Sequence, residues 1–427
     1  MAKINQTNCD SGQHLIPIDE ALKNLLSNAQ PIAETEVLPL IEAQGRILAE
    51  DLTSIINVPP ADNSAMDGYA IRSEDFSSAK ETQLPISQRI PAGVMGTELE
   101  RGTVARIFTG APIPDGADAV VMQEVCTLIE NDDANDDSNS NESIDNDIKI
   151  TGPIPVGQNI RKAGEDIAIG DILLKAGTKL KPQDIGLIAS VGIGEISVYK
   201  RLRVGVFFTG DELREPGETL EPGQIYNSNR HTLRGLLENL NCEVVDFGTI
   251  EDTLEATKTA MLKASESTDL VMTSGGVSVG EEDYVRIALE EIGQLNLWRI
   301  NIKPGKPLAF GNIGGKPFLG MPGNPVSVLV TFCIFARPFI LQKQGASETR
   351  ANSFMVAADF EWLKAGKRHE YVRARVENNV IKLFPHQGSG VLTSTSWANG
   401  LAVIPEGVTV KRNDLVEFIP FSELSVV

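Results

Sequence analysis

The sequence predicts a multidomain protein of the α/β plus β class. We expect a three-layer α/β domain with a mostly parallel sheet, a β-rich N-terminal lobe and a small C-terminal β-barrel-like domain. Three observations lead to this prediction. Strand and helix patterns alternate regularly over residues 203–343. Short β-like runs separated by Pro and Gly turns occupy residues 57–162 and return after residue 354. The chain of 427 residues is long enough for about two to four domains.

Composition limits the classes of function that the chain can have. The net charge of −20 argues against general binding to nucleic acid or to anionic lipid, so neither a nucleic-acid partner nor a membrane is expected. The longest apolar stretch, near residues 326–336, is too short to span a bilayer, and the N-terminus lacks an apolar signal core. The four cysteines are Cys9, Cys126, Cys242 and Cys333. Their scatter argues against a structural zinc site and predicts a reducing, cytoplasmic location.

The first part of the chain is predicted to be helical. Residues 1–14 are polar, and we expect them to be a disordered lead-in. Apolar residues recur at helical spacing over residues 18–26, with acids in the first turn where the helix dipole favours them. A second helical pattern covers residues 38–52. Residues 15–56 and 163–185 are therefore predicted to form a discontinuous N-terminal helical and linker domain.

Residues 57–162 are predicted to form the β-rich domain, with strands at 69–72, 104–108 and 119–122. The segment 59–70 leads into the first of these strands and brings two carboxylates and a serine close together in a turn-rich stretch. Its chemistry fits an Asx-turn before a strand as well as it fits a functional site.

The segment 130–147 is of low complexity. It contains eight Asp and Glu residues, no Lys or Arg, and many Asn and Ser residues. Such a segment cannot bury enough apolar surface to order itself, so we expect a disordered, solvated loop between two strands. The spacing of an EF-hand is absent, and we do not interpret the segment as a metal site.

Residues 186–347 are predicted to form the α/β domain, because strands that alternate with helices require a parallel sheet covered on both faces. Strands are expected at 204–208, 243–247, 270–273 and 297–302, and a hairpin at 308–310 with 317–319. Helices are expected at 184–190, 229–240, 254–264 and 285–292, with a last one from Asn324-Pro325.

The third strand of this domain runs into a Gly- and Ser-rich turn, Ser274 to Gly280, ahead of a helix. Gly275, Gly276 and Gly280 let the backbone approach a ligand closely, and the arrangement exposes backbone N–H groups to an anion. The spacing is neither G-x-G-x-x-G nor the lysine-bearing P-loop, so it does not select one phosphate-bearing ligand. A tight turn without a ligand is the alternative interpretation.

This turn is one of five loops that follow the predicted strands. The loops are Thr209–Glu212, Gly248–Asp252, Ser274–Gly280, Lys303–Pro307 and Met321–Pro325. Because parallel strands end at one edge of a sheet, we expect the loops to converge on one crevice. The crevice would offer carboxylates for a metal ion, glycine backbone for phosphates and two lysines for an anion. A solvated surface loop is the alternative for the lysine segment.

The alternation ends after residue 344. Short β-like runs at 371–376, 380–384, 401–404 and 415–419 predict a small all-β domain over residues 348–427. This domain carries Arg373, Arg375 and the turn His386–Gly390.

Seven motifs stand in order along the chain: Asp62–Tyr69, Thr109–Pro114, Gly164–Asp166, Thr209–Glu212, Ser274–Gly280, Lys303–Pro307 and Pro322–Pro325. Together they resemble the MoeA family of molybdopterin molybdenumtransferases, which is similar to the gephyrin E-domain. The resemblance covers about residues 15–420. It implies insertion of molybdenum from molybdate into adenylylated molybdopterin in the presence of Mg²⁺, with release of AMP and formation of molybdenum cofactor.

The resemblance also implies a homodimer. Its active site would combine the α/β domain of one subunit with the domain of the other subunit that carries Asp67 and Thr109. The implied protein partners are molybdopterin adenylyltransferase and the proteins that mature molybdoenzymes.

Residue roles follow from the same resemblance. It implies catalytic roles for Asp67, Thr109, Glu212, Asp252, Asp283 and Lys303. Molybdate would be held by fixed cations and donors, namely Lys303, Lys306, Arg373 and Ser389. The pterin or its phosphate would lie against Ser274, Gly275, Gly276, Ser278, Gly280, Pro322 and Pro325. Mg²⁺ or the nucleotide would be bound by Asp211, Glu212, Asp252 and Asp283, the last three being the metal candidates. The second subunit would add Arg161 and Asp166.

Other functions fit parts of the pattern. A molybdopterin adenylyltransferase-like enzyme or a nucleotide amidohydrolase would use a similar α/β domain, but the N-terminal motifs and the C-terminal β domain argue against both. A gephyrin-like scaffold is a different class, but no fused domain is visible and the intact charged motifs favour an enzyme. The sequence departs from the family pattern at Arg299, where relatives have lysine. A planar guanidinium does not replace an ammonium in geometry, so the role of this position is open.

Overall fold

The computed structural model describes residues 15–76, 80–129, 146–276, 283–305 and 307–426. The chain divides into two compact units. The first comprises Met1–Glu50, Ala176–Lys181 and Ile196–Val427, and the second comprises Asp51–Lys175 and Pro182–Glu195. This division is coarser than the four domains expected from the sequence, whose boundaries stay a prediction.

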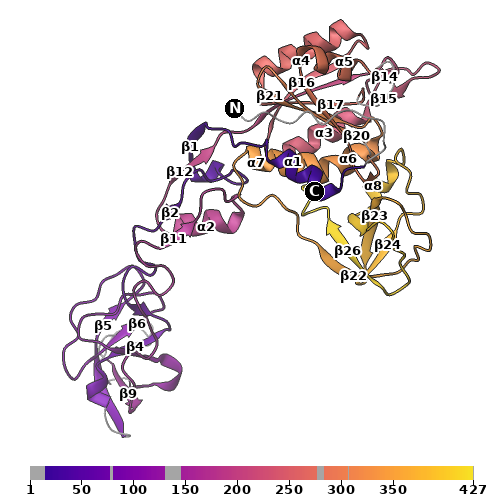
Figure 1. Ribbon diagram of the computed structural model, residues 1–427. Coiled ribbons are helices and arrows are strands. Elements are labelled where there is room, and N and C mark those ends of the chain that lie inside the picture. Colours follow the sequence, from indigo (N-terminus) through magenta and orange to yellow (C-terminus); the bar gives the residue numbers. More distant parts are fainter. Residues whose placement is uncertain (1–14, 77–79, 130–145, 277–282, 306, 427) are drawn as a thin grey trace. The chain divides into compact units, whose positions relative to one another are not determined.

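A six-stranded sheet forms the centre of the first unit (Figure 1). Its strands are β13 (Arg203–Thr209), β16 (Glu243–Ile250), β17 (Leu270–Ser274), β18 (Gly293–Arg299), β20 (Pro307–Ile313) and β21 (Lys316–Met321). The order across the sheet is β16-β13-β17-β21-β20-β18, and only β20 runs antiparallel to its neighbours. The expected mostly parallel sheet and the hairpin at its side are therefore confirmed.

Helices cover both faces of this sheet, as Figure 1 shows. They are α3 (Ser228–Asn239), α4 (Leu254–Ser267), α5 (Tyr284–Ile292) and α6 (Pro325–Thr331). Successive side chains of a strand point to opposite faces. Accordingly Val206 and Phe208 of β13 belong to the core with α3, whereas Phe207 belongs to the core with α4 and α5. The result is the three-layer arrangement that the alternating pattern predicted.

The apolar helix after β21 is longer than the sequence suggested. α6 continues through a π-helical segment, Phe332–Ala336, into α7 (Arg337–Lys343). The run Pro325–Lys343 has 19 residues and is long and apolar enough to cross a membrane by length and composition. However, 83% of its most apolar window is buried inside the protein, and its side chains form part of the main core. Packing within the protein therefore accounts for its apolar sequence.

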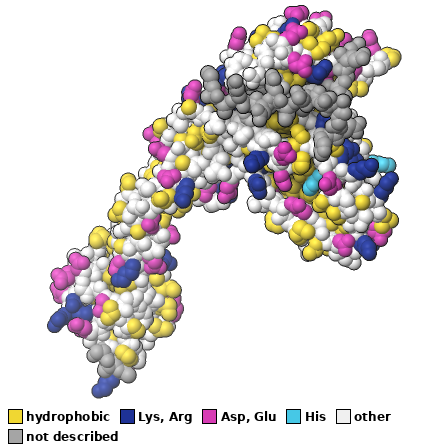
Figure 2. All heavy atoms as spheres, viewed as in Figure 1, with side chains coloured by type: hydrophobic (Ala, Val, Ile, Leu, Met, Phe, Trp, Pro, Cys, Tyr) yellow, Lys and Arg dark blue, Asp and Glu magenta, His cyan; other side chains and the backbone are white. Residues whose placement is uncertain are grey.

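The C-terminal strands close into a barrel. They are β22 (Phe354–Ala358), β23 (His369–Glu377), β24 (Val380–Leu383), β25 (Gly400–Ile404) and β26 (Leu415–Pro420), with a short helix α8 (Thr393–Trp397). The order β23-β24-β22-β26-β25 is closed by pairing of β25 with β23. On the face drawn in Figure 2, Lys and Arg side chains gather over this region. The β-barrel-like prediction is confirmed.

The end of one predicted strand differs from the structure. The sequence suggested a strand of the α/β sheet over 297–302, but that strand ends at Arg299. Residues Ile302–Lys303 form a separate strand, β19, which pairs in parallel with β23 of the barrel. The loop that carries Lys303 is therefore held by the barrel and not only by the α/β sheet.

The N-terminal segment differs from expectation after its first helix. α1 (Ile18–Leu26) forms as predicted, but 38–52 is not helical. It contains β1 (Thr35–Pro39), a 3-10 turn (Leu40–Glu42) and β2 (Leu52–Thr53). Gly45 has a φ of +77°, and the N–H groups of Leu48 and Ala49 donate to Thr178 and Ser197. Distant partners satisfy this backbone, which a helical spacing of apolar residues could not reveal.

The second unit is rich in β-structure. Its main sheet has the order β7-β4-β6-β5-β9-β8, formed by β4 (Gly68–Ile71), β5 (Glu81–Ile90), β6 (Val104–Ile107), β7 (Ala119–Met122), β8 (Thr127–Ile129) and β9 (Asp147–Thr151). Smaller elements are β3 (Asn63–Ser64), β10 (Ile160–Arg161), β11 (Ile172–Leu174), β12 (Glu195–Tyr199), which runs into the first unit, and α2 (Pro182–Ser190). The predicted acidic loop falls between β8 and β9, but its residues 130–145 lie outside the described part of the chain, as does the expected lead-in 1–14.

Candidate functional site

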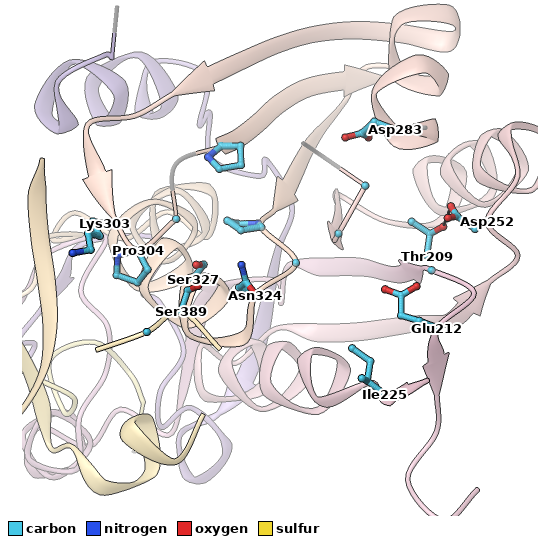
Figure 3. A pocket seen from close by; sticks show the side chains of 18 of the residues that line it. Thr209, Glu212, Ile225, Asp252, Asp283, Lys303, Pro304, Asn324, Ser327 and Ser389 are labelled. Carbon is cyan, nitrogen blue, oxygen red and sulfur yellow. Dashed lines mark hydrogen bonds between the residues drawn. The ribbon is translucent and has the colours of Figure 1, made fainter. Parts of the chain in front are cut away.

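A cavity of about 1120 Å³ lies at the C-terminal edge of the α/β sheet (Figure 3). The residues that line it follow β13, β16, β17, β19 and β21, and further ones come from the barrel. They include Thr209, Glu212, Asp252, Gly275, Asp283, Lys303, Pro322 and Ser389. All of these belong to the first unit. The convergence of loops that the parallel topology predicted is therefore present within one unit.

The carboxylates occupy one side of this cavity, where Figure 3 shows Glu212 and Asp252 near Thr209. The Thr209 hydroxyl donates to Asp252 Oδ1 at 2.6 Å, a short charge-assisted hydrogen bond that orients the carboxylate. Glu212 folds back over Gly210, where a Cβ would lie only 2.6 Å from Glu212 Oε2. The φ of Gly210 is +143°, a backbone conformation that glycine adopts readily and other residues rarely do.

Asp283 lies farther along the same wall, at the start of α5. Its side chain accepts a hydrogen bond from the N–H of Arg286 and is 3% exposed. It therefore caps the helix while it lines the cavity. Within the described residues, no three His, Cys, Asp or Glu side chains form a group that could hold a metal ion. The three predicted metal candidates share the cavity but do not form a ready-made cluster.

The glycine turn lies at the floor of the cavity. Gly275 and Gly276 have φ values of +97° and +64°, and a Cβ at Gly276 would meet Val285 at 2.6 Å. Ser274 lies beneath the turn, where it accepts from Asn229 Nδ2 at 2.9 Å and donates to the carbonyl of Pro322 at 3.0 Å. Asn229 also donates to the carbonyl of Gly323 at 2.7 Å. One amide from α3 thus joins the loops after β17 and β21.

Lys303 stands on the opposite side of the cavity. Its ammonium pairs with Glu370 Oε2 at 2.9 Å, and Glu370 is almost buried. Arg368 lines the same side and donates from Nη1 to the carbonyl of Ile302 at 3.2 Å. Ser327 and Ser389 add hydroxyl groups to the lining. This side offers cationic groups and neutral donors, as an oxyanion requires.

Arg373 does not line the cavity in the way that the sequence suggested. It is 1% exposed, and its guanidinium donates to Ser394 Oγ at 3.1 Å and to the carbonyl of Gly388 at 3.2 Å. Burial lowers the pKa of Arg373 to about 10. The side-chain amide of Gln387 bonds to both backbone groups of Arg373. Arg373 therefore fastens the loop that brings Ser389 to the cavity.

Some of the remaining predicted site residues of the first unit do not line the cavity. Asp211 and Pro325 are adjacent to lining residues but are not among them. Ser278, Gly280 and Lys306 lie outside the described residues. Three residues that line the cavity lie outside every motif and loop named from the sequence, namely Ile225, Ser327 and Arg368. Arg368 ends a basic run and so carried a weak signal, whereas Ile225 and Ser327 carried none.

The second unit contains the other predicted group. Asp67 Oδ1 accepts from both the N–H and the hydroxyl of Thr109, each at 2.7 Å. These bonds hold the pKa of Asp67 below its ordinary value. Arg106 donates to the carbonyls of Gly68 and Ile107, which flank the pair. Arg161 and Asp166 belong to the same unit and are exposed.

Comparison with known families covers most of the chain. Residues 16–192 match the profile of the MoeA N-terminal region (domain I and II), residues 205–342 match a probable molybdopterin binding domain, and residues 356–421 match the MoeA C-terminal region (domain IV).

Individual proteins give the same picture. The chain is 40% identical to the molybdopterin molybdenumtransferase of Haemophilus influenzae over 96% of this chain and 100% of that protein. It is 32% identical to gephyrin of Dictyostelium discoideum over 93% of this chain and 61% of gephyrin. Among solved structures, a molybdopterin biosynthesis MoeA protein from Pyrococcus horikoshii superimposes with a TM-score of 0.82. Its sequence identity is 32%, over 95% of this chain and 100% of that one.

Proposed function

This chain belongs to the MoeA family of molybdopterin molybdenumtransferases, and on that basis we propose that it inserts molybdenum into molybdopterin during molybdenum cofactor biosynthesis. The observation that carries the proposal most strongly is the two-sided cavity of the α/β domain. One side presents Lys303 with neutral donors, and the other presents Glu212 and Asp252. The side with Lys303 suits an oxyanion. The carboxylate side suits a divalent cation that accompanies the phosphates of a nucleotide.

The finer reaction is molybdenum transfer from molybdate to adenylylated molybdopterin with release of AMP. We assign molybdate to the side with Lys303 and Ser389, because a doubly charged oxyanion requires fixed cations and donors. Arg373 supports this side indirectly. Its guanidinium donates hydrogen bonds to Gly388 and Ser394 and so holds the loop that carries Ser389. The glycine turn at 275–276 offers a closely approachable backbone to the pterin or its phosphate.

The cofactor proposed for the opposite side is Mg²⁺. Its preferred ligands are hard oxygens, and it commonly binds one or two carboxylates together with substrate phosphates. Glu212, Asp252 and Asp283 supply such oxygens without forming a complete protein cage, which fits an ion that arrives with the nucleotide. Bound there, Mg²⁺ would neutralise phosphate charge. Thr209 would keep Asp252 in a fixed orientation, and Asp211 would contact the nucleotide.

The active form that we propose is a cytoplasmic homodimer. Asp67, Thr109, Arg161 and Asp166 all belong to the second unit, whereas the cavity residues belong to the first. In the dimer they would complete the site of the partner subunit. The preformed Asp67–Thr109 pair supports this role, because its geometry is fixed before any ligand binds. The proposed protein partners are a molybdopterin adenylyltransferase, which supplies the substrate, and proteins that mature molybdoenzymes.

The test is a direct assay of AMP release. Purified protein is incubated with adenylylated molybdopterin, molybdate and Mg²⁺, and AMP and active cofactor are both measured. We expect AMP release to depend on molybdate and to match cofactor formation. AMP release that is absent, or that is the same without molybdate, would sink the proposed reaction.

A further inference from the structure

Lys303 stands between two cavities. It lines the cavity described above and also a second one of about 850 Å³, which is formed by residues 361–368 and Glu370. Arg368 lines both as well. Both cavities belong to the first unit. Lys303 is 43% exposed at its side chain, so its flexible stem can present the ammonium to either side.

The ammonium is turned away from the proposed oxyanion side. Its partner is Glu370 Oε2 at 2.9 Å, and Glu370 lines only the second of the two cavities. Figure 3 shows the nitrogen of Lys303 pointing away from Ser327, Asn324 and Ser389. Lys303 must therefore leave Glu370, at least in part, in order to contact an anion beside those side chains.

The fold places Glu370 directly beside Lys303. β19 and β23 align Lys303 directly with Glu370, so the two side chains start from neighbouring backbone positions. The loop at Gly366 approaches the carboxylate closely, because a Cβ at this residue would lie 2.6 Å from Glu370 Oε1. Arg368 donates a hydrogen bond to the carbonyl of Ile302, which precedes Lys303 on β19. The backbone register and the burial of Glu370 therefore keep the carboxylate beside Lys303, whose longer side chain is the more exposed of the two.

We propose that Glu370 is a positioning residue that competes with the oxyanion substrate for Lys303. Without an oxyanion the ammonium pairs with Glu370, and on binding it moves to the oxyanion. This inference rests on the proposed function, since it names the partner that Lys303 exchanges. The apparent affinity for every oxyanion is then the intrinsic affinity multiplied by the fraction of time during which Lys303 is not paired with Glu370. It also favours release of the bound anion, because the ion pair between Lys303 and Glu370 forms again.

The test measures binding of molybdate itself, by equilibrium dialysis with quantification of molybdenum. Glu370→Gln keeps the size of the side chain and removes its charge. We expect it to bind molybdate about fivefold more tightly, the factor that corresponds to the upper end for partly exposed ion pairs. Glu361→Gln is the matched control, because it removes the same charge from the same cavity. We expect its affinity to change by less than about twofold.

Two further variants separate competition from a structural role. In a Lys303→Met background, Glu370→Gln should no longer tighten binding, since the competitor then has nothing to hold. Glu370→Asp keeps the buried charge but shortens its reach, and it should give an intermediate gain if Glu370→Gln does not fold. In the assay of AMP release, KM for molybdate should fall in Glu370→Gln without a rise in kcat.

The outcomes are distinct. Unchanged or weaker molybdate binding by Glu370→Gln overturns the competition and leaves the proposed function standing. A gain that persists in the Lys303→Met background also overturns it, because the carboxylate would then act on the anion directly. No molybdate binding by the unaltered protein or by any variant contradicts the proposed site on which the inference rests.

Discussion

Thr209→Val tests whether the orientation of Asp252 matters for the reaction. The substitution replaces one hydroxyl by a methyl group and removes the donor that lies 2.6 Å from Asp252 Oδ1. Thr209 is 7% exposed at the end of β13, while Asp252 is half-buried at the cavity wall. Water in the cavity can replace the lost donor, but it does not fix the carboxylate in one direction.

The expected magnitude follows from this single bond. Hydrogen bonds to charged groups contribute about 1.5–3 kcal/mol, and about 1.4 kcal/mol corresponds to a tenfold change in rate. If the fixed orientation is used in the transition state, AMP release should fall roughly 10- to 100-fold. The free energy of unfolding should fall by no more than about 1 kcal/mol, because the carboxylate stays hydrated.

The assay compares molybdate-dependent AMP release by Thr209→Val, by the unaltered protein and by Thr257→Val. Thr257 is a buried threonine of α4 whose hydroxyl donates to the Thr253 carbonyl, away from the cavity. The control should lose a neutral side-chain hydrogen bond and keep its rate. Rates within twofold for both valine variants would refute the role given to Thr209 and Asp252.

Three further predictions concern Lys303, the Asp67–Thr109 pair and the sharing of the site between two subunits. Lys303→Ala should weaken the use of molybdate far more than the binding of adenylylated molybdopterin, and an equal loss of both would contradict the assignment of Lys303 to the oxyanion. Thr109→Val should raise the pKa of Asp67 toward its ordinary value of about 3.9, as followed by NMR of the carboxyl group. The lowered pKa of Asp67 stabilises the folded state at pH values above the pKa of the unfolded chain, and this contribution should disappear as the pH falls below about 4. At neutral pH the contribution should be smaller in Thr109→Val than in the unaltered protein. Mixing inactive Asp67→Asn with inactive Lys303→Ala should restore AMP release if each site combines two subunits, whereas a mixture that stays inactive would argue against a shared site.

The sequence predicted the α/β domain well because its signals are local. Each strand from Arg203 onward is a short apolar run, and each helix has a period of its own, so both can be identified without knowledge of their neighbours. The helix start at Asn324-Pro325, where a proline occupies the first turn, is an equally local signal. The position of the cavity then followed from parallel topology, which places the ends of the strands at one edge.

The errors arose where distant residues decide the structure. Apolar spacing suggested a helix over 38–52, but Gly45 and partners more than a hundred residues away determine an extended path. The strand β19 joins the barrel through His369 and Glu370, a pairing that no local pattern indicates. Helix propensity and alternation are weak signals where tertiary hydrogen bonds compete with them.

The site shows the same limit at the level of side chains. Sequence order named Lys303 and Arg373 as oxyanion ligands, but it could not show that Glu370 holds one and that the Ser389 loop uses the other. The two faces of β23 pack against different cores, with Tyr371 in the main core and Val372 and Ala374 in the barrel core, so the usual alternation of exposure is lost. An arginine in such a strand carries no sign of the direction in which it points.

The most direct test of the account is to locate molybdenum in the protein. Crystals grown with molybdate, measured by anomalous scattering at the molybdenum edge, would show the position of the metal without any assumption about the reaction. The account predicts a molybdenum peak within hydrogen-bond reach of Lys303 and Ser389, with the ammonium of Lys303 moved from Glu370. Molybdenum bound elsewhere, with Lys303 still paired to Glu370 and nothing beside Ser389, would contradict it.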